Sequence, residues 1–118
     1  MSMIDWSTYR QQLAEMVTEI ARTSPDIARG YRTLAQAHSA GSTLDPKTRE
    51  LIALAVAVTL RCDGCITNHV EAAKKSGATE AEVTDALGVA ISVNAGAALM
   101  YSARTIDAFK APDVPKQG

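Results

Sequence analysis

Two stretches of this chain are apolar on nearly every side, and they limit the folds that it can adopt. Residues 51–60 and 89–100 consist mostly of Ala, Val, Leu and Ile. A helix that is apolar all round must be buried on every side, and a chain of 118 residues has little interior for two such helices. We therefore expect the chain to self-associate, with the small residues 95–98 allowing close contact between helices. A densely packed monomer core is the alternative.

Apolar spacing and cap residues predict an all-α fold, a helical bundle of about six helices. Apolar residues at steps of three and four predict a first helix over about 5–22. A second helix runs from Pro25 to about Ser39. Asp45 as N-cap, followed by Pro46, begins a third helix that reaches Leu60. This cap, together with Ala between the valines, favours helix over strand.

Further capping signals divide the C-terminal half of the chain. A fourth helix begins at Cys62 or Asp63 and ends near residue 75, after two lysines. Thr79 and Glu82 match a capping box, which begins a fifth helix. We expect a break near Asn94, whose side chain can cap a sixth helix.

Length, composition and charge exclude several classes of protein. The length predicts a single domain over residues 1–118, ending in a frayed tail at 111–118. The net charge of -1, without clustered Lys or Arg, offers no electrostatic footprint for nucleic acid or an anionic membrane. The run at 51–60 is shorter than the roughly 20 residues that a transmembrane helix needs. The N-terminus lacks the pattern of a secretory signal, so we expect a cytoplasmic protein.

The chain has only two cysteines, Cys62 and Cys65, and one of its two histidines, His69, follows them. At the start of a helix these three side chains share one face. A free thiol with a pKa of about 8.5 must ionise to react, and a helix N-terminus and Arg61 favour the thiolate. His69 lies one turn from Cys65 and can accept its proton. Cys65 is then the nucleophile and Cys62 the resolving thiol.

Glu50 joins this chemistry only if the chain reverses direction. On one straight helix, twelve residues would separate Glu50 from Cys62 by roughly 18 Å. If the chain turns near residues 61–62, Glu50 faces His69 across an antiparallel helix pair and can orient the imidazole. Otherwise Glu50 is a solvated acid in the first turn of a helix.

Zinc binding is the other interpretation of the cysteine pair. Cys62, Cys65 and His69 would need a fourth ligand, from Asp63, His38 or a neighbouring subunit. Their spacing on a single helix differs from the paired knuckles of structural zinc sites. Outside such a site, Asp63 is expected to be a helix cap and His38 a surface residue at a helix end.

The complete pattern is Glu50, eleven intervening residues, Cys62-x-x-Cys65, three residues and His69. It resembles the AhpD-like alkylhydroperoxidase branch of the carboxymuconolactone decarboxylase family. The resemblance covers about residues 44–109, including the lead-in Leu-Asp-Pro-Lys-Thr-Arg-Glu-Leu-Ile and the later Ser-Gly-Ala-Thr-Glu-Ala-Glu-Val. It implies an all-α fold and homo-oligomers, often trimers or hexamers.

The resemblance also implies a function, a hydroperoxide reductase that needs no cofactor. Cys65 would attack the peroxide, Cys62 would resolve the product into a disulfide, and Glu50 and His69 would relay protons. An external dithiol, of thioredoxin or lipoyl type, would reduce the disulfide. Full-length AhpD is longer and carries a histidine where this chain has Gly64. The alternatives are a non-catalytic oligomeric redox sensor or zinc-binding module, and lactone decarboxylation, whose branch does not depend on a Cys-x-x-Cys pair.

Overall fold

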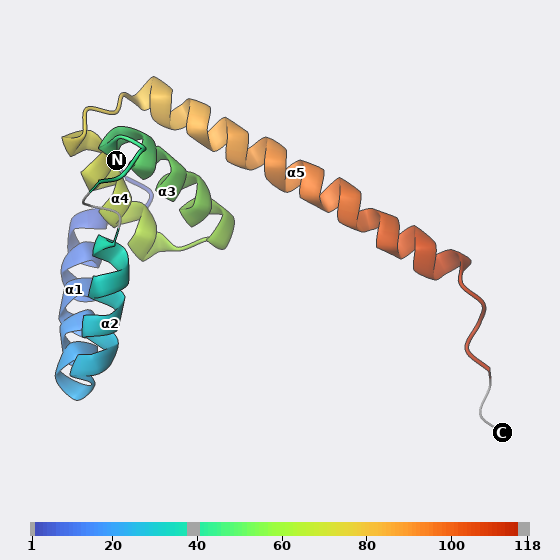
Figure 1. Cartoon of the computed structure of the whole chain (residues 1–118), viewed down its shortest axis with the longest axis horizontal. Coiled ribbons are helices and arrows are strands. Elements are labelled where there is room, and N and C mark those ends of the chain that lie inside the picture. The colour runs from blue at the N-terminus through green and yellow to red at the C-terminus, as the bar shows by residue number, and fades with distance from the viewer. Residues whose placement is uncertain (1, 38–40, 116–118) are drawn as a thin grey trace.

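The structure is a computed structural model that describes residues 2–37 and 41–115, and it is all-helical. No strand occurs among the described residues, which confirms the predicted fold class. Five helices follow one another along the chain (Figure 1): α1 (Trp6–Thr23), α2 (Pro25–Gln36), α3 (Pro46–Leu60), α4 (Asp63–Lys75) and α5 (Glu80–Lys110).

The predicted caps begin two of these helices. Asp45 accepts a hydrogen bond from the backbone N–H of Thr48 at 2.7 Å, and Pro46 is the first residue of α3. At the start of α5, the Thr79 hydroxyl accepts from the N–H of Glu82 at 3.1 Å, and the Glu82 carboxylate accepts from the N–H of Thr79 at 3.0 Å. Both sets of bonds pair backbone donors that a helix start leaves unsatisfied.

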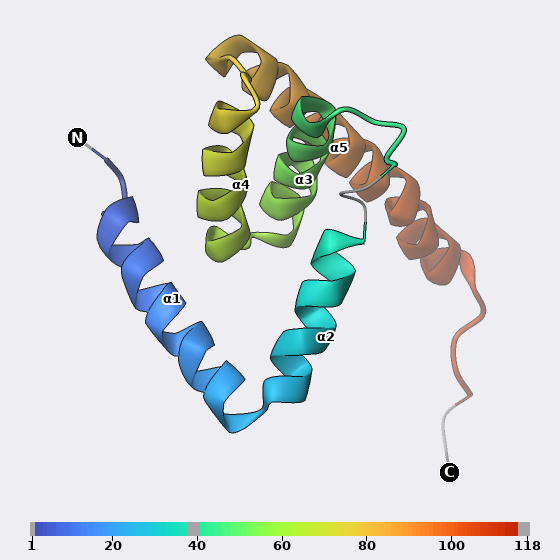
Figure 2. The same ribbon diagram turned by 60° about the vertical axis from the view of Figure 1, so that its left-hand side comes forward.

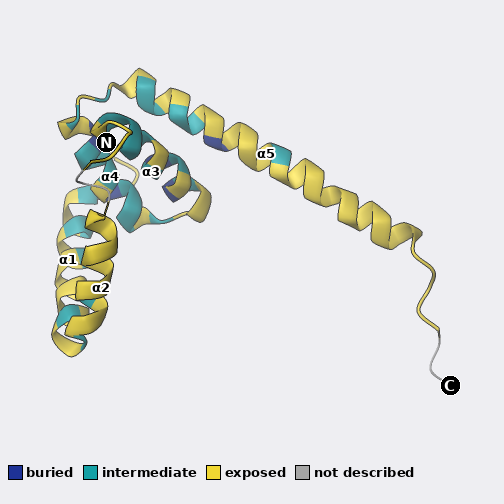
Figure 3. Ribbon diagram, in the orientation of Figure 1, coloured by how far each residue is buried: buried dark blue, intermediate teal, exposed yellow. Residues whose placement is uncertain are grey.

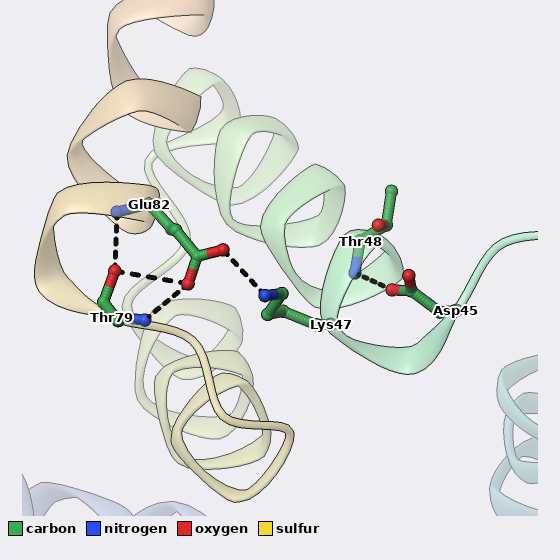
Figure 4. Close-up of polar contacts among 5 residues, drawn as sticks. All are labelled: Asp45, Lys47, Thr48, Thr79 and Glu82. Carbon is green, nitrogen blue, oxygen red and sulfur yellow. Dashed lines mark hydrogen bonds and ion pairs between the residues drawn. The ribbon is translucent and has the colours of Figure 1, made fainter.

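An ion pair connects these two helix starts (Figure 4). The ammonium of Lys47 in the first turn of α3 lies 2.7 Å from the Glu82 carboxylate in the first turn of α5. Lys47 lowers the pKa of Glu82, and the N–H of Thr79 lowers it further. Glu82 in turn raises the pKa of Lys47. The pair holds the N-terminal end of α5 beside that of α3.

The predicted break near Asn94 is wrong, because α5 runs through this residue without interruption. The side-chain amide of Asn94 donates to the carbonyl of Ala90 in its own helix, at 2.7 Å, and to the hydroxyl of Thr59 in α3, at 2.9 Å. These bonds attach α5 to α3 instead of capping a sixth helix. The chain therefore has five described helices where about six were expected.

Two other predicted boundaries lie partly outside the described residues. Helix α2 ends at Gln36, whereas the sequence predicted an end near Ser39; Ser39 and His38 are not among the described residues. Helix α5 ends at Lys110, and residues 111–115 are not helical. The rest of the predicted tail, residues 116–118, is not among the residues that the structure describes.

The helices are arranged around α3 and α4, which pack against each other (Figure 2). Helix α1 contacts α4 and forms a V with α2, while α5 packs on α3. The second half of α5 then projects away from the other helices and is exposed (Figure 3). Few described residues are buried, and they lie mostly on the helices around this centre: Leu54, Ala57, Thr67, Ala73 and Ala90.

Helix α5 is also the one described helix that is long and apolar enough to cross a membrane, judged by length and composition. Its most apolar 18-residue window has a mean hydropathy of 1.5, and 6% of that window is buried. The sequence interpretation considered residues 51–60 alone as a possible span. The continuous helix makes 80–110 the longer apolar element.

Candidate active site

A left-handed residue reverses the chain between α3 and α4. Arg61 has φ 55° and ψ 49°, and its N–H donates to carbonyls at the end of α3. The N–H of Cys62 donates to the carbonyl of Ala57 at 3.0 Å. These bonds close the C-terminus of α3 and direct α4 back along it. This is the reversal on which the predicted role of Glu50 depends.

Glu50 of α3 and His69 of α4 meet across the pair. Glu50 Oε2 lies 2.6 Å from His69 Nδ1. A carboxylate has no proton to give, so Nδ1–H donates and Nε2 is the ring nitrogen left to exchange a proton. The two side chains are 24% and 38% exposed, so the pair is partly shielded and still reachable.

The cysteines begin α4 and are joined to each other. Cys62 and Cys65 form a disulfide, with their Cα atoms 5.3 Å apart. Cys62 is the N-cap of α4, and its sulfur accepts the N–H of Cys65 at 3.2 Å. Asp63, one of the residues expected as cap, is instead the exposed first residue of the helix.

Cys65 and His69 lie four residues apart on α4, and therefore one turn apart on one face. A cavity of about 420 Å³ opens beside His69 and Glu50. The remaining lining residues come from α2, α3 and the segment between them: Ala35, Ser42, Leu44, Arg49, Ile52 and Ala53. The two cysteines do not line this cavity. The imidazole thus has the cavity beside it and a thiol one turn away.

Helix α1 packs over Gly64, which lies between the cysteines in the first turn of α4; the sequence did not predict this contact. A Cβ at Gly64 would lie 2.9 Å from Leu13 Cδ2 and 3.9 Å from the Tyr9 hydroxyl. Arg10 Nε donates to the hydroxyl of Thr67 on α4 at 3.0 Å, and Thr67 is buried. The available signal was the glycine between the cysteines, since a helix packing this closely leaves little room for a side chain.

The described residues do not form the zinc site that the sequence offered as an alternative. Among the described residues, no group of three or more His, Cys, Asp or Glu side chains is arranged to hold a metal ion. Of the proposed fourth ligands, Asp63 is exposed at the start of α4 and His38 lies outside the described residues. The arrangement in the structure is a cysteine pair with a separate carboxylate–imidazole pair.

These features define an all-α protein with a Cys-x-x-Cys pair at a helix N-terminus and a Glu–His pair between antiparallel helices. Over residues 25–108 the chain matches the carboxymuconolactone decarboxylase family. It belongs to that family, as its resemblance indicated. The match extends closer to the N-terminus than residue 44 and includes α2.

Relatives with similar sequences match three quarters or more of the chain. An uncharacterized protein of Haemophilus influenzae is 48% identical over 105 residues, which are 89% of this chain and 93% of the relative. Uncharacterized protein 4 in the cox locus of Paracoccus denitrificans is 34% identical over 88 residues, 75% of this chain and 79% of its own.

Two solved structures share the fold. A carboxymuconolactone decarboxylase family protein from Legionella pneumophila, crystallised in its apo form, has a TM-score of 0.71 and 35% identity, covering 89% of this chain and 94% of its own. A protein from Methanobacterium thermoautotrophicum has a TM-score of 0.66 and 32% identity, covering 74% of this chain and 97% of its own.

Proposed function

We propose that this chain is a thiol-dependent hydroperoxide reductase of the AhpD-like type. Cys62 and Cys65 are its redox pair, and His69 and Glu50 its proton relay. One observation carries the proposal: a carboxylate–imidazole hydrogen bond of 2.6 Å lies on the same helix pair, one turn from a cysteine that forms a disulfide with its neighbour. Helical spacing puts the Cys65 thiol one turn before the imidazole of His69, which supports this pairing of thiol and base.

In the first step, the Cys65 thiolate attacks the terminal oxygen of a hydroperoxide ROOH. An S–O bond forms, the O–O bond breaks and its electron pair leaves with the alkoxide. His69, which has taken the thiol proton, returns it to the alkoxide, so ROH departs and Cys65 carries a sulfenic acid. Glu50 holds the imidazole through Nδ1, which leaves Nε2 free for the proton transfer.

In the second step, the Cys62 thiolate attacks the sulfur of the sulfenic acid. The S–O bond breaks, the hydroxide takes up a proton and leaves as water, and the disulfide forms. The N-cap position suits Cys62 to this role, because the N–H of Cys65 points at its sulfur. An external dithiol, of thioredoxin or lipoyl type, then supplies two electrons through a mixed disulfide, and no cofactor is required.

The cavity beside Glu50 and His69 supports an organic hydroperoxide as substrate. Leu44 and Ile52 give it apolar walls, and about 420 Å³ accommodates an alkyl group. We place the protein in the cytoplasm, where reducing conditions return the disulfide to the dithiol.

The test is peroxide consumption by metal-free protein supplied with a dithiol. We expect turnover in the wild type and in Glu15→Gln, a control that removes an exposed carboxylate of α1. Cys65→Ser should abolish turnover, and His69→Ala should lower it about 100-fold or more. Equal turnover in the wild type, Cys65→Ser and His69→Ala contradicts the proposal. A wild type that shows no turnover and binds stoichiometric zinc, when Cys65→Ser does not bind it, would indicate the zinc-binding module.

A further inference from the structure

One wall of the cavity beside Glu50 and His69 carries a positive charge. Arg49, Ile52 and Ala53 all line the cavity. They stand at positions i, i+3 and i+4 of α3 and therefore share one face of that helix. Arg49 is half-buried at this wall. The reaction proposed for Cys65 and His69 does not use its guanidinium.

The acidic residue of the cavity is engaged on another side. Among the described residues that line the cavity, Glu50 is the one carboxylate, and its Oε2 lies 2.6 Å from His69 Nδ1. Arg49 precedes Glu50 by one residue, which turns its side chain about 100° around the helix. The cavity thus has the carboxylate–imidazole pair on the side of α4 and the guanidinium on a different face of α3.

The position of Arg49 is unfavourable for the helix that carries it. Arg49 is the fourth residue of α3, close to the N-terminus, where the helix dipole favours anions and disfavours cations. Lys47, the other cation near this end, is paired with Glu82 at 2.7 Å. Helix stability therefore gives no reason for an arginine at this position. A bound anion does, because both the guanidinium and the helix end attract it.

The remaining walls of the cavity are mostly apolar. Leu44 and Ile52 are about half exposed at 48% and 49%, and together with two alanines they line a volume of about 420 Å³. Apolar walls with a single cation suit a ligand that has an apolar body and one negative group. A carboxylate matches the fork of a guanidinium with two parallel hydrogen bonds. Arginine has five N–H donors, so it can bind a carboxylate and keep other hydrogen bonds.

We propose that the cavity binds a carboxylate with an alkyl chain, in which Arg49 pairs with the carboxylate and Leu44 and Ile52 contact the chain. Together with the proposed function, on which this step rests, the substrate is then the hydroperoxide of such an acid. Its peroxide group lies on the side of His69, one turn from Cys65. Hydrogen peroxide would use neither the apolar walls nor the cation, and a neutral alkyl hydroperoxide would not use the cation.

Binding of octanoate tests this carboxylate site without any peroxide. The ring signals of His69 are followed by NMR while octanoate is added to the wild type. We expect saturable shifts, with binding at least tenfold weaker for octanamide, which lacks the charge, and for acetate, which lacks the chain. Equal binding of octanoate and octanamide, equal binding of octanoate and acetate, or no saturable binding of octanoate overturns the proposal.

Variants assign the charge to Arg49. Arg49→Gln should weaken octanoate binding about tenfold, and Arg49→Lys should weaken it less, because lysine keeps the charge and loses the fork. Arg32→Gln is the matched control, since it removes an exposed arginine of α2 that does not line the cavity. Unchanged octanoate binding in Arg49→Gln overturns the proposal. The comparison of octanoate with octanamide uses the wild type alone, so it decides the question even if Arg49→Gln is unstable.

A matched pair of peroxides tests the site in the reaction. Cumene hydroperoxide and its 4-carboxylate derivative differ only in the charged group. The wild type should have a kcat/KM about tenfold higher for the carboxylate, and Arg49→Gln should lose this preference. Octanoate binding without turnover of either peroxide supports the carboxylate site and contradicts the hydroperoxide reductase. Turnover of both peroxides with equal kcat/KM in the wild type overturns the assignment of Arg49 to substrate binding.

Discussion

Replacing Glu50 with Gln isolates the part of the relay that the tertiary structure assembles. The change keeps the size of the side chain and an oxygen that can accept from His69 Nδ1, but it removes the charge. A hydrogen bond to a charged group contributes about 1.5–3 kcal/mol and a neutral one about 0.5–1.5 kcal/mol. Since His69 is 38% exposed, the lower ends of these ranges apply, and the difference is about 1 kcal/mol.

This difference predicts a loss of about fivefold in the rate of Cys65 oxidation, because about 1.4 kcal/mol corresponds to a factor of ten. Glu50→Ala, which removes the whole bond, should lose about tenfold. The assay is a single turnover of the reduced protein with tert-butyl hydroperoxide, followed by the loss of free thiol. Glu15→Gln is again the matched control.

A double-mutant cycle decides whether Glu50 acts through His69. If it does, the Glu50→Gln/His69→Ala variant should be no slower than His69→Ala alone. The reasoning is refuted if Glu50→Gln has no effect in the wild type, or lowers the rate fivefold again without the imidazole. The cycle therefore tests Glu50 as a positioning residue for His69.

Three further predictions concern the frame that holds the site. Gly64→Ala should change the free energy of unfolding, measured with urea, by less than about 1 kcal/mol, because the gain in helix propensity offsets the contact with the movable end of Leu13. In a Leu13→Ala background, which removes that contact, Gly64→Ala should stabilise the protein. Thr67→Val removes the buried hydroxyl that accepts from α1 and should cost about 1 kcal/mol in the same assay; no loss would contradict a stabilising bond. Lys47→Gln should lower the melting temperature at pH 7. The pKa of Glu82 is lowered from 4.5 and that of Lys47 is raised from 10.5, so the ion pair stabilises the fold between these pH values. The difference in melting temperature between Lys47→Gln and the wild type should therefore shrink below about pH 4.5 and above about pH 10.5. A difference that is constant with pH would argue against the ion pair.

The sequence by itself determined the local features of this protein. Asp45, Thr79 and Glu82 predicted where α3 and α5 begin, because a cap acts on backbone groups within three residues. The spacing of Cys62, Cys65 and His69 likewise predicted a thiol pair and an imidazole on one face of α4, since helical periodicity follows from residue number alone.

Tertiary structure decided which helices meet and where they continue. Glu50 reaches His69 because Arg61 adopts a left-handed conformation, which an arginine side chain does not predict. Asn94 does not end a helix, since a hydroxyl of α3 lies within reach of its amide. Gly64 is covered by α1, which comes from about 50 residues earlier in the chain. For Asn94 and Gly64 the deciding partner is distant in sequence, and local propensity carries no information about it.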